Sequence, residues 1–212
     1  MIKYFKYFLY LYVFIGYSLS NAGSYDDFFS ALTFDKPEII QKLLARGFDP
    51  NTPSEKGVPA LVFAIQSESP KSALVLAKNL QTQVNVQNQL GETPLMLAAI
   101  NNQIELAAVL INRGADVNRP GWTPLHYAAT RGHREMMRLL LDNDAYIDSE
   151  AANGTTPLMM AAMYSNSDMV KLLLESGAEA YLRNDQELSA EDFALKAGRE
   201  DSARLIRQVL ER

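Results

Sequence analysis

The side chains of this 212-residue chain best suited to acid–base chemistry or metal binding near neutral pH are its two histidines, His126 and His133. They lie seven residues apart, on two different predicted helices, so they lack the i, i+4 spacing of a helical zinc pair. The chain has no cysteine, which excludes disulfide bonds and thiolate metal sites. The histidines therefore predict a structural role and no metal site.

Carboxylates are the next candidates for chemistry. Asp26 with Asp27, and Glu191 with Asp192, could share acid and base roles if the fold brought such groups together. Each pair lies toward one end of the chain, in a stretch that we expect to be solvated, and nothing in the sequence forces the pairs to converge. The chain has no G-x-S-x-G elbow, Walker loop or glycine-rich dinucleotide motif. The sequence thus predicts a protein that is not an enzyme and binds no cofactor.

The elements that hold these residues come from an internal repeat. Residues 93–99 (TPLMLAA), 123–129 (TPLHYAA) and 156–162 (TPLMMAA) are nearly the same, and a degenerate match begins at Ser189. The corresponding leucines are spaced 34, 30 and 33 residues apart; they are Leu61, Leu95, Leu125 and Leu158. A period near 33 residues predicts an array of stacked units rather than one closed core.

Each unit reads as two helices and a loop. Thr-Pro suits the start of the first helix, since threonine can cap it and proline fits its first turn. The second helix carries an apolar stripe and ends where the chain needs a left-handed residue, at Gly47, Gly114 and Gly177, with Asp144 in the fourth unit. We expect Asp144 to destabilise its turn slightly. The 30-residue spacing shortens one loop by three residues at 118–121 and leaves Trp122 just beyond its tip.

This pattern resembles the ankyrin repeat, whose signature is T-P-L-H-x-A-A followed by a second helix and a Gly-Ala-Asp turn. The resemblance implies an all-α solenoid with short hairpin fingers and a charged cap at each end. It also implies that His126 hydrogen-bonds backbone groups of neighbouring units, and that His133 is the histidine of the family's Gly-His pair. We count about six repeats in a domain over 23–212, at about 24–56, 57–90, 91–120, 121–153, 154–187 and 188–211.

The first 22 residues have the layout of a secretory signal peptide. Lys3 and Lys6 precede an apolar run at 8–15, and Ser20 and Ala22 suit a cleavage site after Ala22. The alternative is an uncleaved anchor over residues 4–19. The whole chain carries net charge −5, and losing the two lysines leaves −7. With no basic cluster, we expect neither nucleic-acid binding nor a membrane contact after cleavage.

A partner surface follows from the resemblance alone. Ankyrin arrays bind partners on a concave surface made by the fingers and the exposed face of the first helix, through the residue before Thr-Pro and the two residues after Ala-Ala. In the central repeats these positions are Glu92, Ile100, Asn101, Trp122, Thr130, Arg131, Thr155, Met163 and Tyr164. In the second repeat they are Val58, Gln66 and Ser67. Tryptophan, tyrosine, arginine and methionine are typical interface anchors. The alternative for Trp122 is packing across its own shortened finger.

The sequence therefore predicts a monomeric, non-enzymatic protein-binding module in the periplasm or secreted, similar to small periplasmic ankyrin proteins of Gram-negative bacteria. Two alternatives stay open. One is an effector delivered to a host cell. The other is a periplasmic accessory or antioxidant factor acting through methionines, although we expect most methionines to fill the core and only Met163 to face the groove.

Overall fold

A computed structural model describes residues 23–211 of the chain. They divide into two compact units, with the boundary in the chain between Gln83 and Val84. The expected signal peptide, its cleavage after Ala22 and the alternative anchor over residues 4–19 lie outside the described residues. Within 23–211, no helix combines the length and apolarity needed to cross a membrane.

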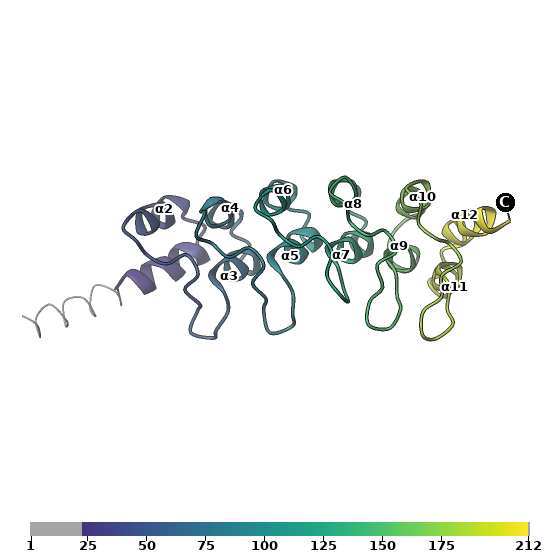
Figure 1. Ribbon diagram of the computed structural model, residues 1–212, viewed down its shortest axis with the longest axis horizontal. Helices are drawn as coiled ribbons and strands as arrows, with labels where there is room; N and C mark the ends of the chain where they lie inside the picture. Colours follow the sequence, from purple (N-terminus) through teal and green to yellow (C-terminus); the bar gives the residue numbers. More distant parts are fainter. Residues whose placement is uncertain (1–22, 212) are drawn as a thin grey trace, which may run out of the picture. The chain divides into compact units, whose positions relative to one another are not determined.

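The first unit contains two helix pairs (Figure 1). Residues 23–33 are helical and are followed by α2 (Pro37–Ala45), α3 (Ala60–Gln66) and α4 (Pro70–Lys78). Phe28, Leu32 and Ile40 are completely buried between these helices. The Phe28 ring packs on Phe48, with 4.5 Å between the ring centroids.

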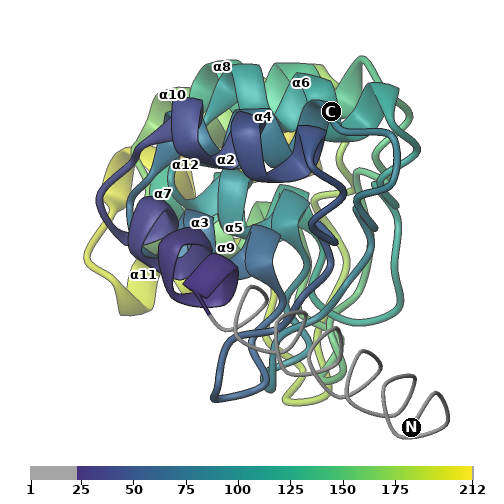
Figure 2. The same cartoon turned by 90° about the vertical axis from the view of Figure 1, so that its left-hand side faces the viewer.

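The second unit contains four helix pairs. Its helices are α5 (Pro94–Ile100), α6 (Ile104–Asn112), α7 (Pro124–Arg131), α8 (Arg134–Leu141), α9 (Pro157–Tyr164), α10 (Ser167–Glu175), α11 (Ala190–Lys196) and α12 (Glu200–Leu210). Helices α5, α7, α9 and α11 form one row, α6, α8, α10 and α12 form a second, and the fingers leave the first row on the side away from the second (Figures 1 and 2). The prediction of an all-α array of helix pairs is confirmed.

The first helices of the pairs begin as the Thr-Pro motif predicts. The Thr93 hydroxyl accepts a hydrogen bond from Met96 N–H at 3.3 Å, and Thr156 does the same for Met159 at 3.4 Å. Thr123 and Ser189 occupy the same capping position before α7 and α11. Such caps satisfy backbone donors that the first turn leaves without partners.

Most second helices end in a left-handed residue, and the left-handed position expected for Asp144 is confirmed, while its destabilising effect stays a prediction. Asp144 has φ +62°, where the other pairs use Gly114 (φ +81°) or Gly177 (φ +98°). The end of α4 is different, because its cap residue Asn79 is extended (φ −73°, ψ 126°). The sequence offers no glycine there, and Leu80 beside it is 85% exposed.

An asparagine at the base of several fingers ties neighbouring repeats together, a feature that the sequence analysis missed. Within the second unit, Asn85 donates to the Gly114 carbonyl at 3.0 Å and accepts from Asp116 N–H at 2.9 Å. Asn118 makes the same pair of bonds to Asp144 and Tyr146, both at 2.7 Å. Asp148 replaces asparagine at the next step and only accepts, from Glu179 N–H at 3.1 Å.

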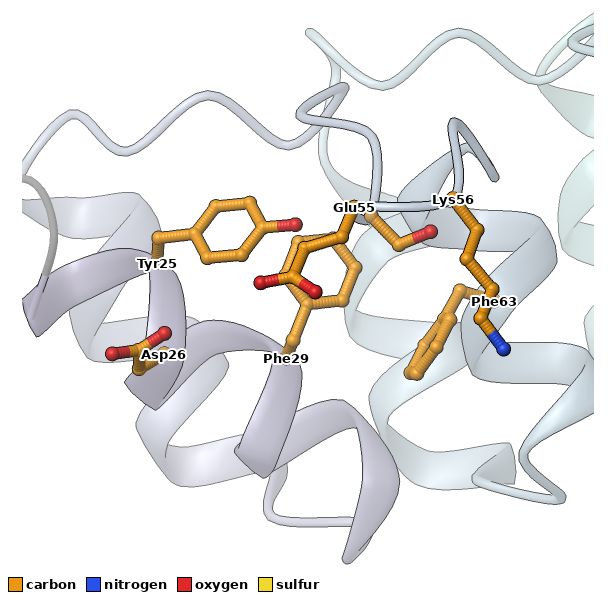
Figure 3. Close-up of a pocket in the computed structure, with 7 residues that line it drawn as sticks. Tyr25, Asp26, Phe29, Glu55, Lys56 and Phe63 are labelled. Carbon is orange, nitrogen blue, oxygen red and sulfur yellow. The ribbon is translucent and has the colours of Figure 1, made fainter.

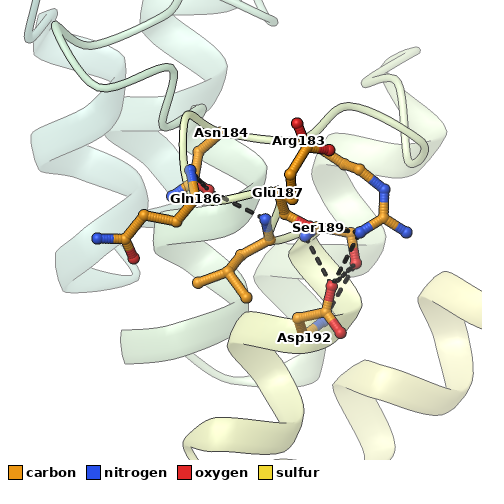
Figure 4. Close-up of polar contacts among 7 residues, drawn as sticks. Arg183, Asn184, Gln186, Glu187, Ser189 and Asp192 are labelled. Atoms are coloured by element: carbon orange, nitrogen blue, oxygen red, sulfur yellow. Dashed lines mark hydrogen bonds and ion pairs between the residues drawn. The ribbon is translucent and has the colours of Figure 1, made fainter.

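The last finger and helix form a charged end (Figure 4). At the start of α11, Asp192 accepts hydrogen bonds from the Ser189 N–H at 2.8 Å and the Ser189 hydroxyl at 2.7 Å. The Arg183 guanidinium lies 3.5 Å from the same carboxylate. These Ser189 bonds, helped by Arg183, lower the pKa of Asp192, so the side chain stays ionised. The expected polar cap is built in this way.

Candidate protein-binding surface

His126 is a structural residue that joins two repeats. Its side chain is completely buried, with Nδ1 2.9 Å from the Thr123 hydroxyl and accepting from the Thr123 N–H at 3.2 Å. Since Nδ1 accepts, the proton is on Nε2, which donates to the Thr155 carbonyl at 3.0 Å. Burial lowers the pKa of His126, so the ring is neutral at pH 7.

His133, directly before α8, also links its repeat to a backbone group of the preceding repeat. Its Nε2 lies 3.0 Å from the Ile100 carbonyl, at the end of the preceding first helix. Arg199 occupies the same place before α12, and its Nε donates to the Met163 carbonyl at 2.8 Å. The two histidines therefore serve separate backbone groups, and no group of three potential ligands among residues 23–211 could hold a metal ion.

The finger at 118–122 differs from its neighbours in how it is closed. In the 151–155 finger, Ala151 N–H donates to the Thr155 carbonyl and Gly154 N–H to the Ala151 carbonyl, both at 2.9 Å. The fingers that begin at Ser54, Asn88 and Asn184 have the same two bonds. Across the fully described stretch 118–122, no backbone hydrogen bond of this kind is present. The short finger lacks three of the residues present in the other fingers, so it cannot form the turn that the bond from Gly154 N–H to the Ala151 carbonyl closes in the 151–155 finger.

The short finger leaves hollows on both of its flanks. On one side, a cavity of about 370 Å³ includes Leu90, Glu92, Trp122 and Tyr127 among its lining residues. On the other, a cavity of about 300 Å³ lies against Tyr146 and Glu150. Leu90 is 83% exposed at the rim of the first hollow, and Tyr146 is 68% exposed at the second.

Trp122 is both packed and accessible. Its ring lies 5.4 Å from the His126 ring and 5.4 Å from the Tyr127 ring, centroid to centroid, yet 39% of the residue is exposed. It is the only tryptophan of the chain. One part of the ring therefore stabilises the start of α7, and the rest lines the hollow.

The polar groups of the larger hollow are fixed in place. Glu92 accepts from the Tyr127 hydroxyl at 3.0 Å and from the Asn88 amide at 2.7 Å. Burial, followed by the contact with Glu92, raises the pKa of Tyr127 to about 12. With the Gln87 amide oxygen turned toward it, the Arg119 guanidinium donates two hydrogen bonds of 2.6 and 2.9 Å. The polar groups of this hollow are therefore held by hydrogen bonds, beside the apolar side chains of Leu90 and Trp122.

The sequence-predicted residues lie at two ends of the first-helix row. Glu92 and Trp122 line the same hollow at the finger end. The positions after Ala-Ala lie at the opposite ends of α5, α7 and α9, where Asn101, Arg131 and Tyr164 are exposed and Ile100, Thr130 and Met163 are half-buried. Thr155 is only 3% exposed, so its side chain is not available at the surface.

The comparisons with known proteins agree with this architecture. The family model described as "Ankyrin repeats (3 copies)" matches residues 28–120, 73–151, 119–184 and 147–208. The chain belongs to the ankyrin repeat family. This fold is generally a non-enzymatic scaffold for protein–protein interaction.

Individual relatives of this ankyrin repeat protein match parts of it. Ankyrin repeat and SAM domain-containing protein 6 of Rattus norvegicus is 34% identical over 109 residues, 50% of this chain but 12% of the rat protein. Notch-regulated ankyrin repeat-containing protein of Xenopus tropicalis is 34% identical over 82 residues, 37% of this chain and 72% of that protein. A crystal structure of an ankyrin repeat domain from Acinetobacter baumannii has a TM-score of 0.75 at 24% identity, covering 85% of this chain and 95% of that one.

Some residues of the candidate surface escaped the sequence analysis. Leu90 and Arg119 lie within the fingers, outside the three positions carried over from the family. Tyr127 is the residue after the repeat histidine, and its link to Glu92 spans 35 residues of sequence. The 30-residue spacing between Leu95 and Leu125 was the sequence signal for this surface, because a shorter finger leaves exposed the side chains that a full-length finger would cover.

Proposed function

We propose that this ankyrin repeat chain is a non-enzymatic protein-binding module whose partner docks on the second unit, around Trp122. The single observation that carries the proposal is the exposed part of that ring, held in a preformed hollow beside the short finger. Large, rigid aromatic rings in such hollows are frequent binding anchors. A partner that reaches along α7 and α9 would also meet Arg131 and Tyr164, the exposed side chains at the far ends of these helices.

We further propose that the mature protein begins after Ala22 and acts as a monomer in the periplasm or outside the cell. The composition of residues 1–22 supports this location. The antioxidant alternative gains no support from the methionines. Of the seven within residues 23–211, six are buried and only Met163 is half-exposed. Buried methionines pack the core and react slowly with oxidants.

The test is affinity capture with the mature chain and with a triple variant, Trp122→Ala, Arg131→Ala and Tyr164→Ala. The matched control is Tyr181→Ala, since Tyr181 is 64% exposed in the same unit but belongs to neither end of the proposed surface. We expect the triple variant to lose the proteins captured by the parent and the control to keep them. Circular dichroism melting verifies the fold. Equal capture by a folded triple variant would refute the proposed surface.

A further inference from the structure

Another hollow lies entirely within the first unit, whereas the surface around Trp122 belongs to the second unit. Its volume is about 310 Å³, and it is lined by helical residues 23–33, the finger at 54–58 and α3. Figure 3 shows that Tyr25 and Phe29 reach it from the helix, Glu55 and Lys56 from the finger, and Phe63 from α3. Nothing in the repeat pattern predicts it, because the repeat motif does not specify the side chains that line it.

Three aromatic rings form the wall of this hollow. The Tyr25 and Phe29 centroids are 4.7 Å apart, and Phe63 meets Phe29 edge-on at 5.2 Å. The Tyr25 hydroxyl donates to the Pro53 carbonyl at 3.3 Å, which links the helix to the finger. All three residues are half-buried, so their rings are held by packing and still partly accessible. The faces of such rings carry partial negative charge.

Two carboxylates stand at the opening. Asp26 and Glu55 line the hollow and are both exposed, and Lys56 is the one basic residue beside them. The ion pairs found within residues 23–211 involve other acids. Burial, followed by the negative charges of Glu55 and Asp26, raises the pKa of the Tyr25 hydroxyl, so the field of both carboxylates reaches into the hollow.

We propose that this hollow binds an arginine side chain of a partner protein. A guanidinium is flat and cationic, so it can lie on the ring faces while its N–H groups reach Asp26 and Glu55. An anion would face two carboxylates and one lysine, and a purely apolar group would strip water from both carboxylates without replacing it. The acidic chain, at net charge −5, favours a basic partner in general. This site is independent of the Trp122 surface.

The test is an NMR titration of the mature chain, with labelled tyrosine and phenylalanine rings, using the blocked tripeptide acetyl-Gly-Arg-Gly-amide. The matched control peptide carries citrulline, which has nearly the same shape without the charge. We expect saturable shifts of the Tyr25, Phe29 and Phe63 rings with the arginine peptide and none with the citrulline peptide. No saturable shift, or equal shifts with both peptides, would overturn the proposal.

Variants separate the proposed site from general attraction to an acidic protein. The double change Asp26→Asn and Glu55→Gln should weaken binding about tenfold, as expected for two partly exposed ionic contacts. Lys56→Gln should strengthen it severalfold by removing the competing cation. Glu38→Gln, at an exposed acid of α2 that does not line the hollow, is the control and should change nothing. If Glu38→Gln weakened peptide binding as much as the double variant does, the binding would come from the overall negative charge of the protein and the proposed site would be wrong.

Discussion

Two neighbouring fingers of the second unit show how loop length decides what an array presents. The finger at 151–155 is closed by its own backbone, and Thr155 at its end is 3% exposed. Counted from its base residue Asn118, the finger at 118–122 is three residues shorter than the matching stretch 148–155, and the residue that corresponds to Thr155, Trp122, is 39% exposed. The helices that follow, α9 and α7, both begin with Thr-Pro. The difference therefore lies in the loop, which exposes an aromatic ring without altering the scaffold.

His126 connects the two fingers, so its removal has the largest expected effect. His126→Ala removes one of the two hydrogen bonds that the Thr155 carbonyl accepts, leaves the Thr123 N–H without its partner and opens a cavity under Trp122. We expect a loss of about 3 kcal/mol in the free energy of unfolding. His133→Ala, at a half-buried site with one bond, should cost about 1 kcal/mol. Urea denaturation measures both, and equal losses would contradict the linking role of His126.

The glycine near each finger tip should respond differently to an added methyl group. Gly154 has φ +73°, and a Cβ there would stand 3.1 Å from the Asn184 Cα in the next finger. Gly121 has φ +84° with nothing within 4 Å. We expect Gly154→Ala to cost about 2 kcal/mol, from strain plus the clash, and Gly121→Ala about 1 kcal/mol, from strain alone. Thermal unfolding compares the two, and a larger loss at Gly121 would show that the short finger is the tightly packed one.

The residues at the base of the two fingers, Asn118 and Asp148, differ in one atom, because the amide nitrogen of Asn118 is replaced by a carboxylate oxygen in Asp148. Asn118 donates and accepts, whereas Asp148 can only accept when ionised. Asn118→Asp should therefore destabilise by about 1 kcal/mol at pH 7, and Asp148→Asn should stabilise by a similar or smaller amount. Burial raises the pKa of Asp148, so the penalty of its charge disappears as pH falls through that pKa. The benefit of Asp148→Asn should shrink in acid, and a benefit that grew there would contradict this account.

The smallest expected effect is a pH dependence. Because burial lowers the pKa of His126, the unfolded chain binds a proton between the ordinary histidine pKa and the lowered one, and the folded chain does not. The stability contributed by His126 is present above about pH 6.5 and is lost as pH falls below it. The difference between the parent and His126→Ala should thus narrow from pH 7 to pH 5 in chemical denaturation. A constant difference would mean that the folded ring also takes up the proton.

The sequence predicted the helices well because each one depends on local signals. Thr-Pro starts, a left-handed residue at the end and apolar stripes are all readable within one repeat, and Asp144 adopts the expected left-handed conformation. Long-range contacts were harder to predict. The bond between Tyr127 and Glu92 and the bridges from Asn85 and Asn118 join residues 26 to 35 positions apart. The burial of Thr155 likewise depends on a complete finger, which no single position reveals.

The central claim is that the short finger presents Trp122 to a partner, and the ring itself can report on it. As the only tryptophan of the chain, Trp122 gives the whole tryptophan fluorescence signal. The partner is first purified by capture on the mature chain. It is then added to the chain while tryptophan emission and acrylamide quenching are recorded, and any tryptophan signal of the partner itself is subtracted. The account predicts a blue shift and protection from acrylamide on complex formation. A stable complex in which both stay unchanged would contradict it.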